Sequence, residues 1–138
     1  MSRQALADAK EEEIRQRISS LGYEEKQAFY SATTKNLKDP DTYAVLNWLF
    51  IAGLHHFYLN KTSKGLINLS IFLLSLIGLI VSISTAYSTG IWICLGVEVL
   101  ISLIELPQLF MSQVIVQEYN NALMEKALAN IHTPINLS

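Results

Sequence analysis

The chain has 138 residues, enough for one domain, and 51% of them are hydrophobic. Its formal net charge of −2 argues against a nucleic-acid-binding protein, because no basic stripe is present to release counterions. The single cysteine, Cys94, excludes an internal disulfide, and the acidic, polar N-terminus is unlike a signal peptide.

Charged residues are concentrated at the start of the chain. Seven of the ten Lys and Arg residues and eight of the twelve Asp and Glu residues precede Tyr43, whereas the 33 residues from Gly65 to Val97 carry no charge. A soluble domain of this length cannot bury so long an apolar run. The sequence therefore predicts an all-α integral membrane protein. We expect a cytoplasmic amphipathic helical head in 1–40, a membrane domain in 41–117 and a short helical tail in 118–138.

The head is expected to contain two helices. Apolar residues recur at helical spacing over 3–21, and Gly22 is a stop signal. These residues are Ala7, Ile14, Ile18 and Leu21. A second helix is expected over 23–36, with Ala28, Phe29 and Tyr30 as its apolar patch. Because this apolar area is small, we expect the helices to pack on each other, on another subunit or on the membrane surface; the alternative is a solvated, disordered arm.

Three apolar segments follow the head: 42–59, 65–86 and 91–116. The first has about the minimum length for a span, and its polar residues Asn47, His55 and His56 make it a reluctant one. The other two are long enough to cross a bilayer. The short, uncharged link 87–90 predicts that they form a tight antiparallel transmembrane hairpin, preceded by the first segment as a membrane-embedded element.

Basic residues favour one orientation. Lys and Arg in short loops tend to stay in the cytoplasm, so the head is expected there. If segment 42–59 crosses completely, Lys61 and Lys64 lie outside, against this rule. If it only dips into the membrane, all ten basic residues and both termini are cytoplasmic, which is the preferred interpretation.

Polar residues form two stripes within the apolar segments. Cys94, Glu98, Ser102 and Glu105 share one face of segment 91–116, and Asn68, Ser75, Gly78 and Ser82 share one face of segment 65–86. Small and polar residues are the usual contacts between helices in lipid. Folding the chain about position 88 predicts three pairings: Ser82 with Cys94, Gly78 with Glu98, and Ser75 near Ser102.

Glu105 is expected at the membrane end that holds the 60–64 link, close to His55, and we predict a Glu105–His55 pair. Buried ionisable groups in a membrane need such partners. The main hypothesis is that these polar groups hold the helices together; the alternatives are a proton or ion path through Glu98 and Glu105, or polar contacts between subunits. No metal site is expected, because adjacent helical residues such as His55 and His56 point about 100° apart. No cofactor or catalytic residue is predicted.

The first apolar segment carries an unusual motif. The run from Tyr43 to Phe50 leads into Gly53-Leu54-His55-His56-Phe57-Tyr58-Leu59-Asn60, and Gly65 follows. This resembles the TM-two domain family, small membrane modules marked by G-x-H-R-F-Y-L-G-x-x-x-x-G. The family's arginine is His56 here and its second glycine is Asn60, and its W-x-x-D element has no clean counterpart. The resemblance implies a membrane module with no known general activity, and no enzyme.

The sequence thus predicts a non-enzymatic protein of a bacterial inner membrane, with its N-terminus in the cytoplasm. Its partners would be the lipid bilayer and further copies of itself, in the role of a scaffold or an accessory subunit of a membrane complex. One alternative is an oligomeric ion or proton channel that uses Glu98 and Glu105. Another is an adaptor that recruits a cytoplasmic protein through residues 1–40.

Overall fold

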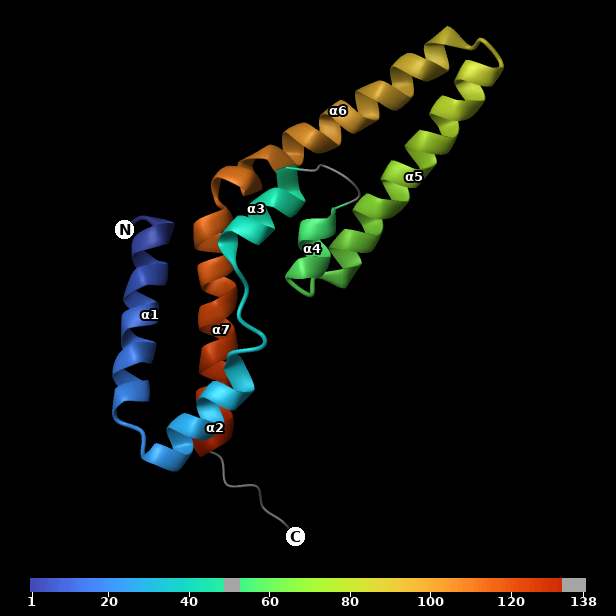
Figure 1. The fold of residues 1–138 in the computed structure, drawn as a ribbon. Helices are drawn as coiled ribbons and strands as arrows, with labels where there is room; N and C mark the ends of the chain where they lie inside the picture. The colour runs from blue at the N-terminus through green and yellow to red at the C-terminus, as the bar shows by residue number, and fades with distance from the viewer. Residues whose placement is uncertain (49–52, 133–138) are drawn as a thin grey trace. The chain divides into compact units, whose positions relative to one another are not determined.

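The computed structural model describes residues 1–48 and 53–132, and helices are the regular secondary structure that it shows there (Figure 1). Parts of two sequence predictions, the middle of segment 42–59 and the tail beyond 132, lie outside the described residues. The chain divides into two compact units. One comprises Pro40–Ser112, and the other combines Met1–Asp39 with the residues from Gln113 onward.

The terminal unit contains both helices expected in the head. Helix α1 spans Arg3–Ser19 and α2 spans Tyr23–Thr33, so the second helix is shorter than predicted. The side chain of Ser2 caps α1 by accepting a hydrogen bond from the amide of Ala5, and Gly22 precedes α2. Of the predicted apolar patch on α2, Phe29 is buried, whereas Tyr30 is 54% exposed.

The third helix of this unit is α7, Ser112–His132, which runs parallel to α1 (Figure 1). Arg3 pairs with Glu118 and Lys10 pairs with Glu125 along the two helices. Buried residues of this unit recur every seven positions: Ala7 and Ile14 on α1 with Leu21 just beyond its end, and Val114, Asn121 and Leu128 on α7. Such spacing keeps one stripe of each helix against its partner. The association of the tail helix with the head helices was not predicted from the sequence.

In the second unit, α5 (Thr62–Ser84) and α6 (Ser88–Phe110) form the expected antiparallel hairpin. Both helices are long and apolar enough to cross a membrane. Their link is residues 85–87, earlier than the predicted 87–90, because the chain reverses at Ala86, whose φ of 54° is left-handed. Residues 88–90 already belong to α6, and 113–116, expected in the third apolar segment, belong to α7.

The predicted pairing of the two polar stripes is wrong by one helical turn. A Cβ on Gly78 would lie 2.9 Å from Sγ of Cys94, and a Cβ on Gly90 would collide with Oγ of Ser82. Ser75 donates a hydrogen bond to the carbonyl of Cys94, 3.1 Å away. The hairpin therefore folds about position 86 instead of 88. A shift of four residues leaves the same faces in contact, since four residues are about one turn.

The described residues of segment 42–59 form two short helices, α3 (Pro40–Trp48) and α4 (Leu54–Tyr58). Their nine and five described residues extend for about 14 and 8 Å, each less than the thickness of a bilayer. Helix α3 packs against α4 and α6, and α4 packs against α5. These contacts bring α3 and α4 to the open end of the hairpin, where α5 begins and α6 ends.

Candidate functional site

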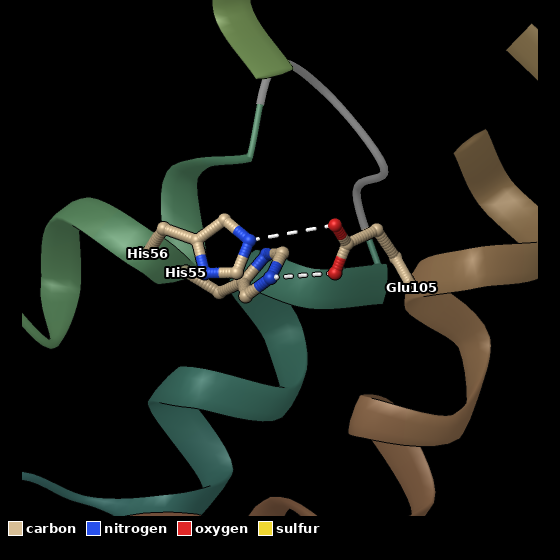
Figure 2. Close-up of side chains that lie close together, drawn as sticks. All are labelled: His55, His56 and Glu105. Carbon is tan, nitrogen blue, oxygen red and sulfur yellow. Dashed lines mark hydrogen bonds and ion pairs between the residues drawn. The ribbon is translucent and has the colours of Figure 1, made fainter. Parts of the chain in front are cut away.

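A polar cluster is buried at the open end of the hairpin, around the carboxylate of Glu105 on α6. Nε2 of His55 lies 3.2 Å from one carboxylate oxygen, and Nε2 of His56 lies 3.4 Å from the other (Figure 2). The three residues are 2–8% exposed. The predicted pair of Glu105 with His55 is thus present, and His56 joins it.

Two amide side chains complete the hydrogen bonding of this carboxylate. Nδ2 of Asn68 on α5 donates to Oε1 over 2.7 Å, and Nε2 of Gln108, one turn along α6, donates to Oε2. The hydroxyl of Tyr43 on α3 donates in turn to Gln108. Each helix of this unit therefore contributes a side chain to the surroundings of this carboxylate. A buried charged or polar group needs such hydrogen-bond partners.

Two glycines bring α4 close enough to α5 for this cluster to form. Gly53 begins α4 with φ 65°, and a Cβ there would lie 2.7 Å from Cβ of Asn68. A Cβ on Gly65 would lie 2.7 Å from the ring of Phe57. Side chains at these two positions would push the helices apart. Gly53, Phe57 and Gly65 of the motif thus contribute to the packing of α4 against α5.

The sequence-based argument that His55 and His56 point in different directions is wrong. Both ring nitrogens meet the same carboxylate, and the ring centroids are 4.1 Å apart (Figure 2). The 100° between adjacent helical positions describes where the side chains leave the backbone, and the length of the imidazole side chains allows their ring nitrogens to meet at one carboxylate. The ring of Tyr43 meets His55 edge-on, with centroids 5.4 Å apart.

Burial sets the charge of the two imidazoles. It lowers the pKa of His55 to about 4, and it also lowers the pKa of His56. Both rings are therefore neutral near pH 7. A neutral imidazole has one nitrogen free to accept a hydrogen bond or bind a metal ion.

A small cavity adjoins the cluster, with a volume of about 10 Å³, room for one water molecule. Asn47, His55, Asn68, Glu98 and Glu105 contribute to its lining. Oδ1 of Asn47 and Oε1 of Glu98 are buried without a hydrogen-bond partner in the structure. The cavity is too small for an organic substrate, since such pockets measure roughly 300–1,000 Å³.

The remaining predicted residues have simpler surroundings. Ser102 donates to the carbonyl of Glu98 within its own helix, and Ser75 and Ser82 are buried between α5 and α6. Leu59 is buried, and Tyr58 is half-buried. Gln108 and Tyr43 were not predicted as members of the cluster, and Asn68 was predicted only as a helix-packing residue. The position of Gln108 three residues after Glu105 was the available signal.

No protein-family model, curated protein or solved structure matches this chain. The likeness to the TM-two domain family stays a prediction from the motif.

Proposed function

We propose that this chain is an integral membrane protein whose α5–α6 hairpin crosses the bilayer. The observation that carries the proposal is the outward-facing apolar surface of the hairpin. Only 11% of the most apolar 18-residue stretch of each helix is buried, and Leu74, Trp92 and Phe110 are at least 70% exposed. Contiguous apolar surface of this extent marks a lipid or protein interface.

The dimensions of the hairpin support insertion. Each helix has 23 residues and extends for about 34 Å, slightly more than the roughly 30 Å hydrocarbon thickness of a bilayer. Exposed Tyr87 and Trp92 lie toward the linked end, and exposed Phe110 lies at the other end. Aromatic residues at both ends are typical of membrane–water interfaces. The positions of the basic residues favour a cytoplasmic open end. The membrane that we propose is a bacterial inner membrane.

Within the membrane we propose a non-enzymatic role, as a self-assembling scaffold or an accessory subunit of a membrane complex. A groove of about 130 Å³ between α5 and α6 supports self-assembly; Ser75, Cys94 and Glu98 are among its lining residues. The carboxyl group of Glu98 is half-buried beside this groove, and a carboxyl group in hydrocarbon is costly without a partner. A polar group from a second copy would satisfy it. The resemblance to the TM-two domain family supports a role as a membrane module.

The native mass of the full chain in mild detergent or nanodiscs tests this function. We expect one defined oligomer, and we expect Glu98→Leu to shift it toward monomer by removing the carboxyl group from the interface. Val99→Leu is the matched control, because Val99 is 58% exposed and adjacent on the same helix. A monomeric wild-type chain would contradict self-assembly, and a protein extracted by alkaline carbonate would contradict membrane insertion.

A further inference from the structure

We propose that His55, His56 and Glu105 form a binding site for a divalent transition-metal ion of the zinc type. The three side chains each offer one ligand atom, and these atoms all lie within 4.8 Å of one another. Two imidazoles and one carboxylate are a donor set that binds zinc or non-haem iron in proteins. The site lies entirely within the Pro40–Ser112 unit, so it does not depend on self-assembly.

The nitrogen–oxygen separations are close to those around a tetrahedral ion. Zinc binds imidazole nitrogen and carboxylate oxygen at about 2.0–2.1 Å, so neighbouring ligand atoms of a tetrahedron are about 3.3–3.4 Å apart. Nε2 of His55 lies 3.2 Å from Oε2 of Glu105, and Nε2 of His56 lies 3.4 Å from Oε1; the set with one ligand atom from each residue lies within 4.8 Å. Small side-chain adjustments would place one carboxylate oxygen and both nitrogens around a common centre.

The surroundings also suit an ion. The amides of Asn68 and Gln108 hold the carboxylate in place, as outer partners commonly do for metal ligands. Both His55 and Glu105 border the cavity that has room for one water, which would provide a fourth ligand. In the same cavity, Oδ1 of Asn47 has no hydrogen-bond partner and is available to accept from that water.

A metal ion here would stabilise the open end of the hairpin. Its ligands come from α4 and α6, and α4 is a five-residue helix that depends on its neighbours for stability. An ion that binds the folded chain shifts the folding equilibrium toward it by mass action. The metal would thus fix the TM-two-like motif against the hairpin, which is a structural role and requires no reaction.

Titration of the metal-free, full-length protein in detergent micelles with Co²⁺ tests the proposal. We expect one Co²⁺ per chain, with the visible absorption bands of a tetrahedral ion, and loss of these bands when Zn²⁺ is added. The variants His55→Gln, His56→Gln and Glu105→Gln should each weaken binding by about 100-fold or more, since loss of an outer partner alone costs 10–100-fold. His132→Gln, which removes the remaining histidine of the sequence, should leave binding unchanged.

A measurement on the wild-type protein keeps the test decisive if a variant fails to fold. X-ray absorption spectroscopy of the Zn²⁺-loaded wild-type chain should show a four-coordinate ion with imidazole ligands, since His55 and His56 are buried side by side. The proposal is overturned if the wild-type chain binds no stoichiometric Co²⁺. It is equally overturned if binding persists in the three ligand variants, or if the bound Zn²⁺ has no imidazole ligand.

Discussion

At the scale of single residues, two positions of the motif in 53–65 have a left-handed backbone. Gly53 has φ 65° and Asn60 has φ 56°, both left-handed. Glycine adopts this region readily, and asparagine is the next most tolerant residue. The resembled motif has glycine at both positions, so Asn60 departs from it in chemistry and retains the backbone conformation that glycine favours.

We expect Gly53→Ala to lower the free energy of unfolding by about 1–3 kcal/mol, because the added Cβ meets a left-handed backbone and the side chain of Asn68. Denaturant titration in detergent, followed by circular dichroism, measures the change. The matched control is Gly96→Ala on α6, where a Cβ meets nothing within 4 Å. That variant should be neutral or more stable, since alanine is the better helix former. Equal losses in both variants would contradict the proposed strain at Gly53.

At the scale of elements, the terminal unit depends on the pairing of α1 with α7. Ile14, Leu21, Phe29 and Leu128 form its apolar core, with Ile18 and Met124 packed against it. The ion pairs along the helices are partly exposed and each contributes little to stability. The buried Asn121 donates to the carbonyl of Ala7, a contact that favours one register between the helices.

Ile14→Ala should therefore destabilise this unit by about 2–4 kcal/mol through loss of buried apolar volume. Amide hydrogen exchange in the full-length protein measures this loss of stability, because the amides of α1 should exchange faster than in the wild type. Leu6→Ala is the control, because Leu6 lies on the same helix and is 55% exposed. It should change the stability by less than about 0.5 kcal/mol. Unchanged exchange in Ile14→Ala would show that α1 does not depend on its contact with α7.

At the scale of the whole molecule, the proposed membrane hairpin predicts which side of the membrane each of its ends faces. The proposed topology has two crossings, by α5 and α6, and keeps Lys61 and Lys64 on the side of the basic N-terminal residues. The link 85–87 should then face the opposite side.

Single cysteines in a Cys94→Ala background check this topology, because the sequence holds no other cysteine. In intact spheroplasts, a membrane-impermeant maleimide should label Ser88→Cys beside the link and should not label Thr62→Cys at the other end of α5. Both should react after permeabilisation. Labelling of the two positions from the same side would exclude a crossing by α5, and the reverse pattern would contradict a cytoplasmic open end of the hairpin.

The helical class, the two long apolar helices and the pairing of His55 with Glu105 could be predicted from the residues alone. Uninterrupted apolar length and helical spacing are local properties of a chain, and so is the need of a carboxyl group in an apolar segment for a partner. The turn at Ala86, the convergence of His56 on the same carboxylate and the association of α7 with α1 became visible in the folded chain. These depend on contacts between residues far apart in the chain, and side-chain length and packing fix them where periodicity cannot.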